Sequence, residues 1–207
     1  MRKESAEIIK DPKRAEMDCS DKAERVIGMA KTTITKKPAN PNPQQYIERT
    51  LVLIKVDGVQ RGLIGRIIQR FEDAGLKIVG MKMKWINEDF CRRHYFDVAK
   101  RRGEFVLNKL LKYLTEGPVI AMVIEGINAP EIVRKITGST EPKSSAPGTI
   151  RGDFSHHSYL YADEKNIAVK NLIHASGNVE EAKYEIALWF SPDELHTYKT
   201  VHEIHTL

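Results

Sequence analysis

The order of apolar and polar residues predicts a compact α+β domain that begins near residue 48. Two continuous apolar runs, 51–56 and 119–124, are typical of buried strands. Segment 76–86 alternates through Ile78, Met81, Met83 and Trp85, which predicts a strand with one solvated face. A further short strand is expected at Leu172. Apolar residues recur at helical spacing in segments 63–71, 105–114 and 179–190, and further helices are expected at 130–136 and, with a polar composition, at about 88–95.

Taken in order, these elements read β-α-β, further helices, then β-α-β-α. This order predicts a ferredoxin-like split βαβ fold, a four-stranded antiparallel sheet with helices on one face. A turn-rich segment at 57–62 and an ordered loop at 139–154 would join the elements. We assign this domain to residues 48–207. Residues 1–47 lack a sustained apolar face and end in a proline-rich linker, so we expect a flexible N-terminal extension.

Composition narrows the class of protein. The 207 residues are 41% hydrophobic and 29% charged, as in ordinary soluble globular proteins. No apolar run approaches the roughly 18–20 residues that a membrane span needs, and the N-terminus has no apolar core of a secretory signal. The widely separated Cys19 and Cys91 indicate a reducing compartment, so we expect a cytoplasmic protein. A net charge of +5 is too mild to indicate nucleic-acid binding.

The stretch 171–176, Asn-Leu-Ile-His-Ala-Ser, combines an apolar run with a histidine just ahead of a helix. Asn178, followed by Glu181, resembles a capping box at the start of that helix. Glu185 lies two turns into the helix, where its carboxylate can reach back to His174. An imidazole held by a carboxylate has a fixed tautomer and one nitrogen free to attack. A single histidine at a strand end is more often structural, so other residues must decide.

Cationic and hydroxyl side chains elsewhere would complete such a site. Lys55 ends the first apolar run, Arg134 lies on a predicted helix, Thr140 follows a glycine helix stop, and Arg151 lies between Pro147 and Phe154. Each is unremarkable alone and could simply face water. Together they would form a polyphosphate clamp, because guanidinium and ammonium groups suit phosphate oxygens.

At this point several stretches resemble the nucleoside diphosphate kinase family. The resemblance covers about residues 48–200 in unbroken order, and the arginine and histidine segments are very specific. The matching stretches are Glu48–Leu51, Lys55–Gly62, His94–Tyr95, Gly117–Val119, Gly138–Thr140, Pro147–Phe154, Asn171–Ser176 and Glu185–Phe190.

The resemblance implies a role for each candidate residue. His174 matches the histidine that is phosphorylated, Glu185 the glutamate that hydrogen-bonds its ring, and Ser176 the neighbouring serine. Tyr95 matches a tyrosine near the transferred phosphate. By the same resemblance, the nucleotide would be bound at the phosphates by Lys55, Arg134, Thr140 and Arg151, at the ribose by Asn171 with Lys55, and at the base by stacking on Phe105.

The implied activity moves the γ-phosphoryl group of a nucleoside triphosphate to a nucleoside diphosphate by a ping-pong mechanism through phosphohistidine at His174. Substrates would be ATP and other nucleoside di- and triphosphates. Mg²⁺ would arrive with the nucleotide, so no metal site made of protein ligands alone is expected; the adjacent His156 and His157 point apart, and His202 and His205 are weak candidates. The family also implies a homo-oligomer, with hexamers dominant and tetramers known.

Departures from the family pattern leave alternatives open. Val56 stands where proline is common, and Ala175 where glycine is common, so backbone freedom for positive φ beside the histidine would be lost. Residues 155–165 form an insertion that could alter assembly or nucleotide access. A non-catalytic nucleotide sensor or nucleic-acid-binding module is therefore the alternative, as is a kinase whose N-terminal extension merely binds a partner.

Overall fold

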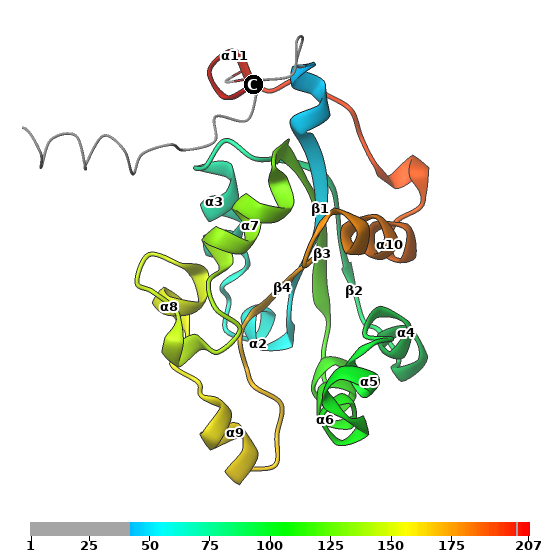
Figure 1. The fold of residues 1–207 in the computed structure, drawn as a ribbon, viewed down its shortest axis with the longest axis vertical. Helices are drawn as coiled ribbons and strands as arrows, with labels where there is room; N and C mark the ends of the chain where they lie inside the picture. The colour runs from blue at the N-terminus through cyan, green and yellow to red at the C-terminus, as the bar shows by residue number, and fades with distance from the viewer. Residues whose placement is uncertain (1–41, 202) are drawn as a thin grey trace, which may run out of the picture. The chain divides into compact units, whose positions relative to one another are not determined.

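The computed structural model describes residues 42–201 and 203–207, and its fold confirms the α+β prediction. A four-stranded sheet has the order β2-β3-β1-β4 (Figure 1). β1 pairs antiparallel with both β3 and β4, and β2 pairs antiparallel with β3. The strands are β1 Ile47–Ile54, β2 Lys77–Lys84, β3 Val119–Ile127 and β4 Ile173–Ala175. The antiparallel split βαβ arrangement is therefore present.

The compact unit begins at Asn42, a few residues before the predicted boundary. A short 3₁₀ helix, η1 (Pro43–Tyr46), leads directly into β1. The expectation of a flexible extension falls mainly on residues 1–41, which lie outside the described residues.

Helices connect the strands and extend beyond them. In chain order they are α2 Val56–Gln60, α3 Ile64–Glu72, α4 Glu88–His94, α5 Val98–Arg102, α6 Glu104–Thr115, α7 Ala129–Thr137, η2 Pro142–Ser144, α8 Ile150–Phe154, α9 Tyr159–Glu164, α10 Val179–Trp189, η3 Pro192–Glu194 and α11 Glu203–Thr206. Among the described residues, no helix is both long and apolar enough to cross a membrane.

Helices cover both faces of the sheet, so the prediction of one covered face was wrong. In β1, Leu51 and Leu53 join a core with residues of α4, α6 and α10, whereas Val52 and Ile54 join a second core with α3 and α7. Figure 1 shows α3 and α7 on one side of the strands and α10 on the other. The reason lies in the continuous apolar runs of the central strands, which leave neither face suited to water.

Strand β2 is an edge strand whose exposed face is apolar. A register shift between Ile78 and Gly80 changes the alternation along the strand. As a result Met81 and Met83, with Trp85 just beyond the strand, are more than half exposed, at 56%, 57% and 65%. The strand was predicted correctly, but its apolar row faces outward.

The connections contain more helix than the sequence predicted. The expected turn at 57–62 is mostly helix α2. Its Gly58 packs tightly, since a Cβ there would lie 2.7 Å from the Ile54 side chain. The loop predicted at 139–154 contains η2 and α8, and the insertion at 155–165 forms α9. These short helices place side chains around one end of the sheet.

Candidate active site

A cavity of about 580 Å³ opens beside β4 and collects most of the predicted site residues. Strand pairing brings its floor together, because His174 in β4 lies opposite Leu53 in β1 and Lys55 follows the end of β1. Predicted residues that line the cavity are Lys55, Tyr95, Arg134, Thr140, Arg151, Asn171 and His174.

A hydrogen-bonded chain behind His174 holds its ring. The Nε2 atom of His174 lies 2.8 Å from Oε1 of Glu185, and the Ser176 hydroxyl donates to Oε2 of the same carboxylate at 2.6 Å. The Ser176 oxygen in turn accepts the backbone N–H of Leu51 at 3.2 Å. Glu185 is 2% exposed, so this carboxylate is oriented entirely by protein groups. Nε2 is therefore occupied, and Nδ1 is the ring nitrogen left for a substrate.

The electrostatic surroundings keep His174 neutral. Burial, with smaller contributions from Lys55 and Arg151, lowers the pKa of His174 to about 3. Burial raises the pKa of Glu185, partly opposed by its neighbours His94 and Ser176. A neutral ring with its proton on Nε2 keeps a lone pair on Nδ1 at neutral pH. The arrangement can therefore present a nucleophile.

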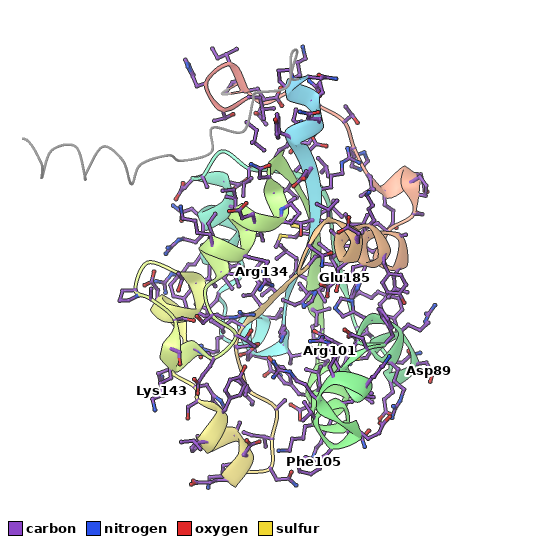
Figure 2. All side chains as sticks on the ribbon, in the orientation of Figure 1. Asp89, Arg101, Phe105, Arg134, Lys143 and Glu185 are labelled. Atoms are coloured by element: carbon purple, nitrogen blue, oxygen red, sulfur yellow. The ribbon has the colours of Figure 1, made fainter. Side chains whose placement is uncertain are left out.

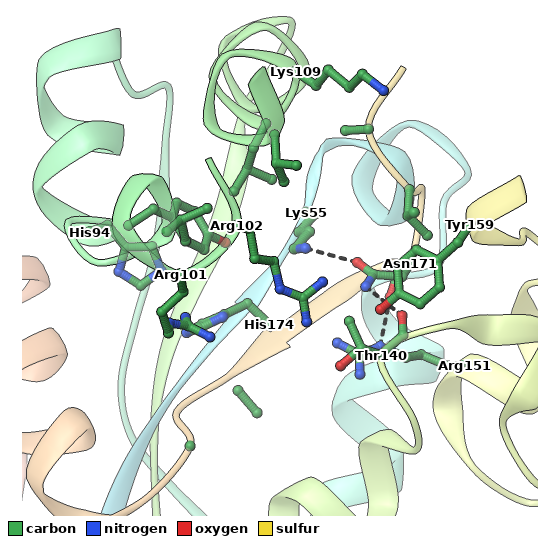
Figure 3. A pocket seen from close by; sticks show the side chains of 18 of the residues that line it. Lys55, His94, Arg101, Arg102, Lys109, Thr140, Arg151, Tyr159, Asn171 and His174 are labelled. Atoms are coloured by element: carbon green, nitrogen blue, oxygen red, sulfur yellow. Dashed lines mark hydrogen bonds between the residues drawn. The ribbon is translucent and has the colours of Figure 1, made fainter. Parts of the chain in front are cut away.

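Lys55 and Asn171 form the next layer. The Lys55 ammonium donates to Oδ1 of Asn171 at 2.8 Å, and Nδ2 of Asn171 donates to the Thr140 carbonyl at 2.8 Å (Figure 3). Burial, followed by the charge of Arg151, lowers the pKa of Lys55 to about 8. Among the described residues no carboxylate forms an ion pair with Lys55. Its charge is thus available to an incoming anion.

Arg151 is held by backbone carbonyls. Its guanidinium donates to the carbonyls of Asn171 at 3.2 Å, Gly138 at 2.9 Å and Ile173 at 2.6 Å. Burial and the neighbouring charge of Arg134 lower the pKa of Arg151 to about 10. A guanidinium has more N–H groups than these bonds use, so Arg151 can still donate toward the cavity.

The family of the chain follows from its similarity to known proteins. The family model described as nucleoside diphosphate kinase matches residues 48–195. This chain belongs to the nucleoside diphosphate kinase family.

Individual relatives agree with this assignment. A nucleoside diphosphate kinase of Borreliella burgdorferi is 46% identical over 155 residues, which are 74% of this chain and 93% of that protein. A structure of the Borrelia burgdorferi kinase, a transition-state mimic with bound vanadate and ADP, superposes with a TM-score of 0.76 and 44% identity, covering 78% of this chain and 98% of the other. A Halobacterium salinarum kinase in complex with CDP gives 0.67 and 41%, covering 77% and 98%. The chain is therefore a nucleoside-diphosphate kinase.

The kinase has a strained residue close to its candidate nucleophile. Leu172 has a φ of 67°, a left-handed conformation that a branched apolar residue rarely adopts. Its N–H donates to Asp57 at 3.1 Å and its carbonyl accepts from Lys55 N at 2.7 Å. Ala175, where loss of positive φ was the concern, is not among the positive-φ residues. Alanine therefore costs no backbone freedom there.

The structure does not bring Phe105 into the cavity. Phe105, labelled in Figure 2, is 63% exposed. The Lys109 ammonium lies 4.2 Å from the centre of its ring. The adjacent Val106 lines the cavity instead, with Leu110 one turn further along α6. The helical register explains the difference, because neighbouring residues of a helix point about 100° apart.

Sequence reasoning missed two cavity residues, one contributed by α5 and one by the insertion at 155–165. Arg102 reaches from α5 into the space between His174 and Asn171, and Tyr159 of α9 points toward Thr140 (Figure 3). Their sequence signals were weak: Arg102 stands in a basic run, and Tyr159 lies in a segment without a family motif. Only the three-dimensional arrangement shows that both line the cavity.

The described residues contain one group with ligand atoms close enough for a metal, namely His94, His174 and Glu185, within 4.8 Å of one another. Nε2 of His174 is already bonded to Glu185, and Nδ1 of His94 accepts the Trp189 indole N–H at 3.2 Å. We therefore assign this group to the hydrogen-bond network that holds the histidine.

Proposed function

We propose that His174 carries the phosphoryl group in this nucleoside diphosphate kinase, that Glu185 and Ser176 hold its ring, and that Lys55 stabilises charge on the migrating group. The observation that carries the proposal is the 2.8 Å bond between Nε2 and the Glu185 carboxylate, which leaves the Nδ1 lone pair to the cavity. In the first half-reaction Nδ1 attacks the γ-phosphorus, and the bond to the β-phosphate oxygen breaks. The diphosphate leaves with that electron pair, and the second half-reaction runs in reverse on another diphosphate.

Glu185 would act chiefly while the phosphorus–nitrogen bond forms. The ring gains positive charge as Nδ1 shares its lone pair, and the carboxylate on Nε2–H stabilises that charge. Because the carboxylate is already held by Ser176, no solvent must reorganise as the charge develops. The expected contribution is positioning and charge stabilisation rather than proton transfer.

The cationic residues would bind the polyphosphate. Lys55 and Arg151 are buried near His174, which favours contact with the migrating group, and Tyr95 has a buried hydroxyl without a partner among the described residues. Arg134 and Thr140 are exposed at the cavity wall and suit the β-phosphate. Asn171, bonded to Lys55, is the candidate for the ribose hydroxyls.

The cavity suits a metal that arrives on the substrate rather than a resident one. Its carboxylates are engaged, Asp97 with Arg101 at 2.6 Å and Asp163 with Lys109 at 3.2 Å. Glu181 accepts the Gly177 N–H at 2.8 Å. Mg²⁺ bound by the phosphates would neutralise oxygen charge during transfer. Lys55 and the arginines would then position the remaining oxygens.

The base would lie against an apolar wall rather than an aromatic ring. Val106, Leu110, Ile167 and Val169 line the cavity together, the last two just after the insertion. Contact with side chains of this kind reads no base edges, so base selectivity should be low and ATP, CDP and other nucleotides should all bind.

We also infer a homo-oligomer and keep the cytoplasmic location as a prediction. The exposed apolar row Met81, Met83 and Trp85 on edge strand β2 favours association, because monomers rarely leave such an edge open. Met83→Lys should lower the mass measured by analytical ultracentrifugation. An unchanged mass would remove this row as the interface. Whether the kinase is a hexamer or tetramer is a question for the same measurement.

The first experiment is intact mass of the denatured protein, kept from acid, after brief mixing with Mg·ATP and no acceptor. We expect a species heavier by one phosphoryl group that disappears when a diphosphate is added and is absent in His174→Ala. Bound nucleotide without a mass gain would contradict the proposal and favour a nucleotide sensor. Deleting residues 1–41 should leave turnover unchanged if that segment only binds a partner.

A further inference from the structure

His94 is a buried histidine that the reaction scheme above does not use. It ends helix α4, its side chain is 0% exposed, and its ring stacks edge-on against the His174 ring with centroids 4.6 Å apart. The Trp189 ring also meets it edge-on, at 5.7 Å. A second histidine this close to a nucleophile and its carboxylate needs a defined protonation state.

Trp189 defines that state. Its indole Nε1–H lies 3.2 Å from Nδ1 of His94. An indole nitrogen can only donate, so Nδ1 of His94 must be the acceptor and bear no proton. His94 is therefore neutral, with its proton on Nε2, and that Nε2–H has no partner among the described residues.

The tautomer of His94 controls what Glu185 can bond. Oε1 of Glu185 lies 3.6 Å from Nδ1 of His94 and 2.8 Å from Nε2 of His174. With a lone pair on Nδ1, His94 cannot donate to Oε1. The oxygen is left to His174, whose proton must then lie on Nε2, which frees Nδ1.

The charges around His94 favour the neutral form. Burial, and next the neighbouring His174, lower the pKa of His94 to about 3, against an opposing effect of Glu185. The titratable and charged groups that face it are Glu185 of α10, His174 of β4, Lys55 at the end of β1, and Tyr95 and Asp97 after α4. The positive charge of Lys55 disfavours a positive charge on His94. Glu185 favours a proton on His94, and its carboxylate would accept a hydrogen bond from Nδ1 if Nδ1 carried that proton.

We propose that Trp189 and His94 are positioning residues that reserve the Glu185 carboxylate for His174, by keeping His94 in its neutral Nε2–H tautomer. The proposal rests on the role proposed for His174. In the absence of the indole N–H, the ring proton of His94 would move from Nε2 to Nδ1, donate to Oε1 and draw the carboxylate away from the nucleophile.

The direct test is the nitrogen spectrum of ¹⁵N-histidine-labelled full-length kinase. We expect His94, identified by its loss in His94→Asn, to show a protonated Nε2 and a bare Nδ1 from pH 6 to pH 8. A protonated Nδ1 in the wild type would overturn the proposal. This measurement needs no activity, so it stands or falls separately from the mass experiment on His174 phosphorylation.

The kinetic test is the pH profile of His174 phosphorylation in Trp189→Phe, expressed as a ratio to the wild type so that nucleotide ionisation cancels. The ratio should be below one by a similar factor at every pH from 6 to 8, because a change of tautomer takes up no proton and burial still keeps His94 neutral. Adding His94→Phe, which cannot donate to Glu185, should restore much of the lost rate. Tyr198→Phe, which removes an aromatic hydroxyl bonded to the Ile78 carbonyl away from the cavity, is the control.

A rate in Trp189→Phe with His94→Phe that is no higher than in Trp189→Phe alone would overturn the proposal, because lost packing at position 189 is not relieved by removing a donor at position 94. A rate in Trp189→Phe equal to that of the wild type would overturn it as well. The melting temperature of each variant is measured by circular dichroism at each pH, and rates are compared with the wild type only below it.

Discussion

The two walls of the cavity differ in how complete they are before substrate arrives. On the nucleophile wall, His174, Glu185 and Ser176 are hydrogen-bonded to one another and to the backbone. On the phosphate wall, Arg134 is exposed, and no side-chain bond or ion pair is found for it among the described residues. The difference indicates that the protein itself orders the group that reacts, whereas the substrate orders much of what binds it.

Lys55 and Arg151 are intermediate: they are hydrogen-bonded by the protein, but their charges are not paired within the described residues. Both are buried cations without a carboxylate partner in the described part of the chain, held instead by an amide oxygen and by carbonyls. Burying an unpaired charge is unfavourable, as the lowered pKa values of both residues indicate. An incoming polyphosphate offsets that cost. The cavity is therefore built for an anion and is less stable without one.

The largest expected effect comes from disrupting the nucleophile wall with Glu185→Gln. An amide can turn its NH₂ group toward Nε2 of His174 and so shift the ring proton to Nδ1. We expect kcat to fall on the order of 10²–10⁴-fold, as when a histidine is forced into the wrong tautomer. The rate of phosphohistidine formation under single-turnover conditions measures this. A fall of less than about tenfold would show that His174 does not depend on the carboxylate.

The next effect is on the stability of the fold, and it also arises from the nucleophile wall. His94 and His174 have pKa values near 3 in the folded state, far below the unfolded value. Unfolding therefore takes up protons below about pH 6.5, and the stability of the fold is lost as pH falls from there toward 3. The limiting slope is about 1.4 kcal/mol per pH unit for each histidine. Urea unfolding between pH 4 and pH 7 should show it, with a smaller slope in His94→Asn.

Removing the Arg134 side chain tests the phosphate wall. Arg134→Ala loses a charge-assisted contact worth roughly 1.5–3 kcal/mol, so kcat/KM should fall at least about tenfold, mainly through KM. Folding should be unaffected because the side chain is exposed. Lys135→Ala, the exposed neighbour outside the cavity, is the matched control and should change neither constant. Equal effects of the two variants would mean that Arg134 attracts nucleotide only by general charge.

The smallest effect distinguishes Phe105 from Val106 as the residue that contacts the nucleotide base. Phe105→Ala should change KM less than about twofold, because a residue outside the cavity leaves substrate binding almost intact. Val106→Ser should raise KM several-fold, since it places a hydroxyl against the base. Steady-state assays with two different diphosphates would compare them. A larger effect at Phe105 would restore the original stacking assignment.

Several features were predictable from the chain alone because they depend on local pattern. The strands and the helices at 63–71 and 179–190 follow from apolar spacing, and Asn178 caps α10 as expected, accepting the Glu181 N–H at 2.8 Å. The position of Phe105 was not predictable, since a one-residue difference in helical register turns a side chain out of the cavity. Neither was the outward face of Met81 and Met83, which depends on a bulge that only pairing with β3 reveals.

By itself the sequence determined the α+β fold, the kinase family and the motif residues that meet at the cavity, because these depend on apolar periodicity and on short, specific motifs. The tertiary structure alone decided how those residues are protonated and bonded. Trp189, His94, Glu185 and Ser176 come from α10, α4 and the segment after β4, and their bonds around His174 depend on distances of a few tenths of an ångström. No local pattern encodes such distances, because they arise from packing between elements far apart in the chain.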